Sequence, residues 1–176
     1  MKRILTLIVF ATLSAGLFAQ SAQLTELIEI ASIESNDGML DVFSVPINGE
    51  RTYFLNVGTL GIGDEIVQIN FDPLFKLFIP LGSNLTEAIE TLGKLKDMYK
   101  EPAGTKTQME ACFAAAVPND KLETITITRR KVLLSNMLEF AVEREGYIRA
   151  THVTKSDLSG ILSSVKFYAK LHKKEL

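Results

Sequence analysis

The spacing of apolar residues in the middle of the chain predicts a helix that begins at Ser83 or Asn84 and ends before Pro102 and Gly104. Asn84 can cap the first turn through its side-chain carbonyl, and Glu87, three residues later, is placed to complete a capping box. The apolar positions that repeat at helical spacing are Leu85, Ala88, Ile89, Leu92, Leu95 and Tyr99. Such a stripe indicates an amphipathic helix that packs on a sheet.

Alternating apolar and polar residues predict strands before this helix. Residues 39–47 and 51–57 flank Asn48-Gly49, which is the strongest short hairpin signal because a type I′ turn needs positive φ at both positions. Residues 23–33 carry apolar side chains at both helical and strand spacing, and we predict a short helix there.

Strand patterns also follow the central helix, over residues 107–117, 122–128, 138–142 and 147–153. Residues 132–134 either continue the second of these strands or start another, and Ser135-Asn136 is expected to form a turn. A closing helix is predicted after Thr154, its apolar stripe being Leu158, Ile161, Leu162, Val165, Tyr168, Ala169 and His172. The order of elements predicts an α+β fold, with antiparallel β-sheet meanders and two amphipathic helices packed on one face in a two-layer single domain.

An apolar segment, FDPLFKLFIPL over residues 71–81, precedes the central helix. Its aromatic residues Phe71, Phe75 and Phe78 are the candidate binding residues, because an exposed cluster of this kind would dock a partner, an apolar ligand or a membrane interface. The competing interpretation, which we favour, is that the segment packs as core beneath the central helix.

The N-terminus has the pattern of a secretory signal peptide. Lys2 and Arg3 precede a short apolar run that ends at Phe18, and Ala19 precedes Gln20. The expected division is therefore a signal peptide over residues 1–19 and one domain over residues 20–176, with cleavage after Ala22 or an uncleaved anchor as alternatives. The leader indicates bacterial export to the periplasm or beyond.

Two further signals would matter in a eukaryote. The C-terminal Lys173-Lys174-Glu175-Leu176 resembles a reticulum retention signal, and Asn84-Leu85-Thr86 fits a glycosylation acceptor. Since Asn84 already suits a helix cap and the lysines suit a helix end, bacterial export remains the favoured interpretation.

Charge and composition narrow the chemistry. The whole chain has a net charge of −2, and loss of the leader removes two basic residues, which argues against nucleic acid as a partner. Cys112 is the only cysteine, so no internal disulfide can form, and the lack of a basic neighbour in sequence favours a buried or half-buried, inert thiol over a nucleophile. His152 and His172 are the only histidines, and neither stands in a metal-ligand spacing. No serine stands in a nucleophile-elbow motif.

These observations predict an exported, non-enzymatic binding protein of the bacterial cell envelope, with an unidentified protein or apolar small molecule as its partner and without a cofactor. One alternative is a small hydrolase without a recognisable motif, for which His152 would be the main candidate base. Another is a peripheral membrane protein that binds through the basic closing helix, residues 155–176.

Overall fold

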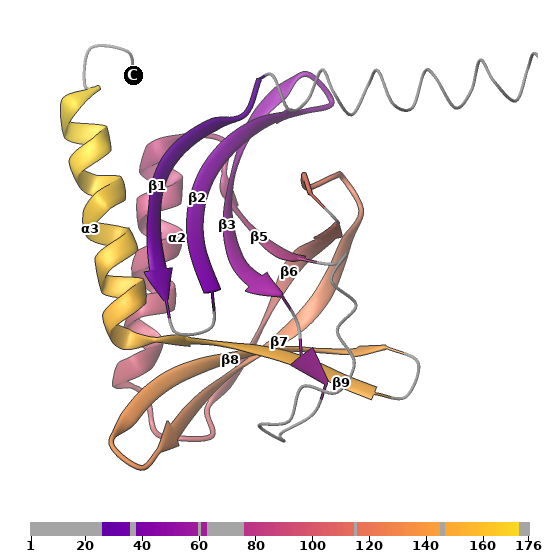
Figure 1. Ribbon diagram of the computed structural model, residues 1–176, viewed down its shortest axis with the longest axis vertical. Coiled ribbons are helices and arrows are strands. Elements are labelled where there is room, and N and C mark those ends of the chain that lie inside the picture. The colour runs from indigo at the N-terminus through magenta and orange to yellow at the C-terminus, as the bar shows by residue number, and fades with distance from the viewer. Residues whose placement is uncertain are drawn as a thin grey trace, which may run out of the picture.

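The computed structural model describes residues 26–35, 38–59, 61–62, 76–114, 116–144 and 147–172. It confirms an α+β fold built from an antiparallel sheet and two helices (Figure 1). The first half contains β1 (Ile28–Ser35), β2 (Gly38–Ile47), β3 (Glu50–Thr59), β4 (Gly61–Ile62), β5 (Lys76–Gly82), α2 (Leu85–Asp97) and the 3-10 turn η1 (Met98–Lys100). The second half contains β6 (Lys106–Ala114), β7 (Leu122–Val132), β8 (Ser135–Arg144), β9 (Tyr147–Thr154) and α3 (Lys155–Leu171). The predicted leader, residues 1–19, lies outside the described residues.

The strands form one sheet in the order β1-β2-β3-β5-β6-β7-β8-β9-β4. The two-residue β4 follows β3 closely in the chain and pairs with β9, with Gly61 opposite Ala150. β3 also touches β9, because the Thr151 hydroxyl donates a hydrogen bond to the Val57 carbonyl oxygen at 3.3 Å. The sheet therefore curls so far that β9 contacts the end of β3, as Figure 1 shows.

Two glycines hold backbone turns that other residues would strain. Asn48 and Gly49 have φ values of 52° and 87°, which confirms the hairpin expected between β2 and β3. Gly82 has a φ of 127°, and a Cβ at this position would lie 2.4 Å from the Cβ of Glu87. A glycine is therefore needed where β5 turns into α2.

Both helices begin at side-chain caps. The Asn84 side-chain oxygen accepts a hydrogen bond from the Glu87 backbone N–H at 3.0 Å, as predicted. The Glu87 carboxylate reaches back to the Ser83 backbone N–H at 2.7 Å, and this bond is the main cause that lowers the pKa of Glu87. At α3, the Thr154 hydroxyl accepts from the Asp157 N–H at 3.2 Å. Among the described residues, no helix combines the length and the apolar character needed to span a bilayer.

Two sequence predictions were wrong about local structure. Residues 28–33 belong to strand β1 and not to the short helix expected over residues 23–33, because they pair with β2 along its length. The turn expected at Ser135-Asn136 lies instead at Leu133 and Leu134, since Ser135 and Asn136 pair with Val132 and Lys131 as the start of β8.

The buried side chains form two clusters. The larger one joins the strands to the buried residues of both helices, which are Leu85, Ala88, Leu92 and Leu95 in α2 and Leu158, Ile161, Leu162 and Val165 in α3. The smaller one consists of Phe43, Val45, Phe54, Phe78, Cys112, Ala114 and Val117. Alternate residues of β5 enter different clusters, since Leu77 and Ile79 belong to the larger one and Phe78 to the smaller. This part of the sheet is therefore buried on both faces.

Candidate functional site

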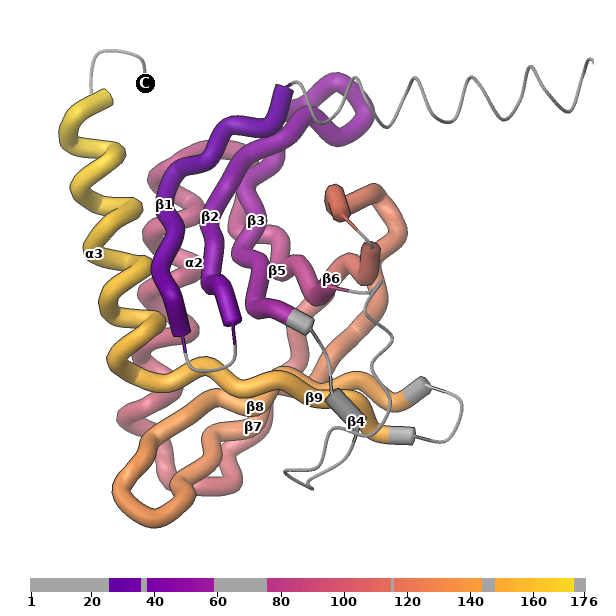
Figure 2. Tube along the Cα trace, in the orientation of Figure 1, coloured from indigo at the N-terminus to yellow at the C-terminus, as the bar shows by residue number. Residues whose placement is uncertain are grey.

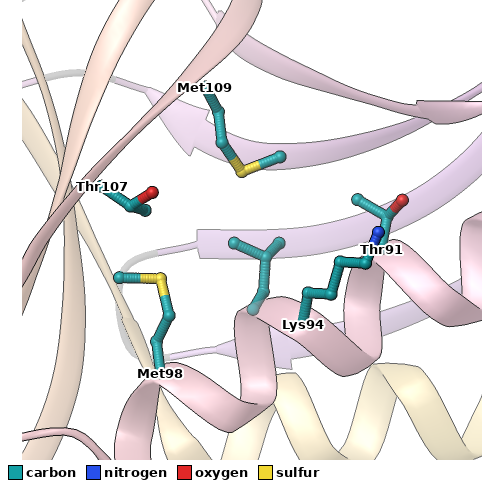
Figure 3. Close-up of a pocket in the computed structure, with 6 residues that line it drawn as sticks. Thr91, Lys94, Met98, Thr107 and Met109 are labelled. Carbon is teal, nitrogen blue, oxygen red and sulfur yellow. The ribbon is translucent and has the colours of Figure 1, made fainter.

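A cavity of about 250 Å³ opens between the C-terminal half of α2 and the first residues of β6 (Figure 3). Its lining residues are Thr91, Lys94, Leu95, Met98, Thr107 and Met109. α2 contributes the first three, η1 contributes Met98 and β6 contributes the last two, and their side chains converge on one space. We refer to this cavity as the α2–β6 pocket.

The wall of the α2–β6 pocket is mainly apolar. Leu95 is buried, and Met98 and Met109 are partly buried against the larger core cluster. The thioether side chains of these two methionines approach the pocket from opposite elements, as Figure 3 shows. Because methionine is unbranched and polarisable, such a wall can adapt to differently shaped apolar ligands.

Polar groups lie at the edge of the pocket. Lys94 and Thr107 are exposed, so their polar atoms are accessible to both solvent and a ligand. The Thr91 hydroxyl instead donates a hydrogen bond to the Leu81 carbonyl oxygen at 3.1 Å, which ties α2 to β5. The ammonium of Lys94 gives the mouth of the pocket a positive charge.

The structure separates the three candidate aromatic residues. Phe71 and Phe75 lie outside the described residues. Phe78 is 1% exposed and packs edge-on against Phe43, with ring centroids 5.7 Å apart and an interplanar angle of 87°. Phe43 also stacks on Phe54 at 6.2 Å. Phe78 is thus part of the smaller core cluster and does not line the α2–β6 pocket, while a docking role for the segment around it remains a prediction.

Cys112 is fully buried in the same cluster, which agrees with the buried or half-buried thiol that was predicted. Its Sγ accepts a hydrogen bond from the Asn119 N–H at 3.1 Å and lies 3.4 Å from the side-chain oxygen of the same residue. Burial is the main cause that raises the pKa of the Cys112 thiol. The environment therefore favours the thiol over the reactive thiolate.

His152 takes part in a row of charged side chains across β7, β8 and β9. Its Nε2 lies 3.4 Å from one oxygen of the Glu139 carboxylate, and Arg130 donates to the other oxygen at 2.8 Å. Glu139 is 6% exposed, and these cross-strand contacts offset the cost of burying its charge. Within the described residues, no hydroxyl or thiol forms a hydrogen bond with His152, and no cluster of three or more potential metal ligands occurs.

Sequence analysis did not identify the α2–β6 pocket. Its methionines lie on a helix and a strand whose patterns were correctly predicted, but the spacing between these elements depends on tertiary packing. No sequence pattern marks the pocket, since Thr91 follows Glu90 and Thr107 stands between Lys106 and Gln108, as is common for residues on a polar surface. A comparison of the chain with protein-family models, curated proteins and solved structures gave no match.

Proposed function

We propose that this protein is a non-enzymatic binding protein of the bacterial cell envelope that holds a small amphiphilic molecule in the α2–β6 pocket. The observation that carries this proposal is an apolar cavity, lined by Leu95, Met98 and Met109, with the cation of Lys94 at its mouth. Small-molecule sites commonly combine an apolar wall with a few polar groups that fix the orientation of the ligand.

The volume limits the size of the ligand. About 250 Å³ is slightly below the range of roughly 300–1,000 Å³ that is usual for drug-sized ligands. A medium-length acyl chain would occupy the space between Met98 and Met109. Its carboxylate would then remain at the open edge, near the Lys94 ammonium. A medium-chain carboxylate therefore matches both the size and the polarity of the pocket.

The wider setting of the proposal comes from the sequence. The signal peptide predicted over residues 1–19 supports export, and the strand–helix order supports two layers, with both helices on one face of the sheet. The shared core cluster of α2, α3 and the strands is consistent with that packing. In such an arrangement the pocket lies at the border of the helical layer.

The direct test is calorimetric titration of the protein with octanoate. We expect saturable binding of one equivalent, and Met98→Trp should weaken it about tenfold or more because the larger side chain fills the cavity. Met39→Trp is the matched control, since Met39 is 49% exposed on β2 and lies outside the pocket.

The role of the charge can be separated from that of the cavity. Lys94→Gln should weaken octanoate binding by up to about fivefold, as expected for an exposed ion pair, and leave octanol binding unchanged. Native mass spectrometry of the protein from its own host should show a small-molecule mass that is lost on denaturation. A bare protein in that experiment, together with no saturable binding of either probe, would show that the pocket has no such ligand.

A further inference from the structure

The turn between β7 and β8 exposes a compact apolar tip. Val132, Leu133 and Leu134 are 52%, 90% and 98% exposed, so the two leucines bury almost none of their side-chain surface. They lie at the end of the orange hairpin that projects from the lower left of the body in Figure 2. We refer to these three residues as the β7–β8 tip.

The stability of the fold does not account for these residues. Leu133 has a φ of 54°, a left-handed conformation that favours glycine or asparagine and is unfavourable for leucine. An ordinary two-residue hairpin turn would carry those residues or aspartate. The turn thus combines an unfavourable backbone conformation at Leu133 with two solvent-exposed leucines. Backbone conformations that cost free energy are concentrated at functional positions in proteins.

An exposed positive charge lies next to the tip. Lys131 precedes it and is exposed, and the segment from Thr124 to Leu138 contains no acidic residue. Arg130 pairs with Glu139 at 2.8 Å. The loop that pairs with Arg129 lies between Glu101 and Lys106, whose opposite charges cancel. The excess positive charge near the tip therefore comes from β7.

Arg129 anchors the base of the hairpin and adds a buried cation. Its guanidinium donates to the Asn136 side-chain oxygen at 2.7 Å and to the Arg130 carbonyl oxygen. Its backbone forms two hydrogen bonds with the loop before β6. The Arg129 N–H donates to the Thr105 carbonyl oxygen, and the Arg129 carbonyl oxygen accepts from the Gly104 N–H. Its Nε has no hydrogen-bond partner, and no carboxylate of the described residues pairs with it. Arg129 is thus a buried cation at the base of the hairpin that is held by neutral acceptors within the described residues.

From this combination we propose that the β7–β8 tip inserts into the surface of a membrane that contains anionic lipids. The two leucines would enter the acyl-chain boundary, while the exposed ammonium of Lys131 would meet the lipid phosphates. A protein partner fits less well, because a stable protein interface buries about 1,000 Å² or more and the tip is only a few residues wide. This site is distinct from the α2–β6 pocket and from the closing helix.

The test places an environment-sensitive fluorophore at the tip of the full chain through Leu134→Cys. The native Cys112 is fully buried and should remain unlabelled, which the parent chain controls. We expect a blue shift and brighter emission with vesicles of equal parts phosphatidylglycerol and phosphatidylcholine, and a much weaker response with phosphatidylcholine alone. The same probe at exposed Glu90 of α2, introduced by Glu90→Cys, should not respond.

Charge variants identify the part of the surface that binds. In the labelled chain, Lys131→Glu should raise the lipid concentration for half-maximal response about tenfold or more, and Lys166→Glu on α3 should leave it nearly unchanged. Leu133→Asn keeps a residue that tolerates positive φ and should weaken the response of the probe without lowering the melting temperature.

Three results would overturn the proposal. The first is a probe at position 134 that stays in a water-like environment on anionic vesicles. The second is an equal response at position 90. The third is a larger effect of Lys166→Glu than of Lys131→Glu, which would assign membrane binding to the closing helix.

Discussion

The hydroxyl of Tyr99 joins η1, the turn that follows α2, to strand β9. Removal of this hydroxyl should destabilise the fold by an amount that depends on pH. Tyr99 follows α2 in η1 and is 5% exposed. Its hydroxyl donates a hydrogen bond to the carbonyl oxygen of Val153 in β9 at 2.6 Å. The variant Tyr99→Phe removes this bond and changes little else in the packing of the ring.

The expected loss at neutral pH follows from the burial of both partners. A net hydrogen bond contributes about 1 kcal/mol, and a buried carbonyl left without a donor costs about 1–3 kcal/mol. Val153 is itself 2% exposed, so water cannot readily replace the lost hydroxyl. We therefore expect Tyr99→Phe to lower the free energy of unfolding by about 1–3 kcal/mol at pH 7.

The same bond predicts how this difference changes with pH. Burial is the main cause that raises the pKa of Tyr99 above the ordinary tyrosine value of 10.0. Above that pH the unfolded chain releases the phenolic proton while the folded chain retains it, so the parent loses stability as pH rises. At pH 11 this loss amounts to about 1.4 kcal/mol for the one group, and Tyr99→Phe does not incur it. The difference in the free energy of unfolding between the parent and Tyr99→Phe should therefore become smaller as pH rises from 7 to 11.

Urea unfolding followed by far-ultraviolet circular dichroism at pH 7, 9 and 11 measures the gap, since the chain has no tryptophan to report by fluorescence. Tyr168→Phe is the matched control, because the Tyr168 ring stacks on His172 at 4.2 Å and its hydroxyl makes no hydrogen bond within the described residues. It should cost less than about 0.5 kcal/mol at pH 7. A Tyr99→Phe gap of zero at pH 7, or one that stays constant up to pH 11, would refute the reasoning.

Three other side chains give separate predictions. Phe78→Ala should cost about 3–5 kcal/mol in urea unfolding, whereas Phe167→Ala, at a residue 63% exposed on α3, should change stability by no more than about 0.5 kcal/mol; equal losses would contradict the assignment of Phe78 to the core. Asn84→Ala should cost about 1 kcal/mol through loss of the α2 cap, and Asn84→Asp should restore most of it; full stability of the alanine variant would show that the cap is dispensable. Cys112 should react with iodoacetamide only as fast as the protein opens, so that labelling accelerates with urea; rapid labelling of the native protein would show that the thiol is accessible.

Local rules predicted those parts of the fold that local interactions determine. Asn48-Gly49 fixes a turn by its own backbone preferences, and the structure places the turn there. Asn84 and Thr154 each satisfy an orphan N–H of the following helix, so both helix starts were predicted correctly. These predictions were correct because each depends on interactions between residues no more than four positions apart in the chain.

The errors arose where distant residues decide the outcome. In the first strand, Ile28 and Ala31 suit a helix, while Ile28 and Ile30 suit a strand; pairing with β2 decides between them. Leu133 and Leu134 have none of the usual turn chemistry, so a turn formed by them could not be predicted. The α2–β6 pocket was unpredictable for a related reason, since the gap between a helix and a strand depends on how the whole sheet curves.

The curl that brings β4 against β9 has a consequence for the order in which the chain folds. Most of the described strand pairs join consecutive strands and can form as successive hairpins, whereas β3 pairs with β5 past β4, and β5 and β6 are joined through α2. The bond between Thr151 and Val57 instead spans 94 residues, and its closure has to overcome the entropy of a long loop. We expect the contacts of β9 with β4 and β3 to form late in folding and to open early in partial unfolding. Amide hydrogen exchange at Gly61 and Ile62 should therefore be faster than in the centre of β7.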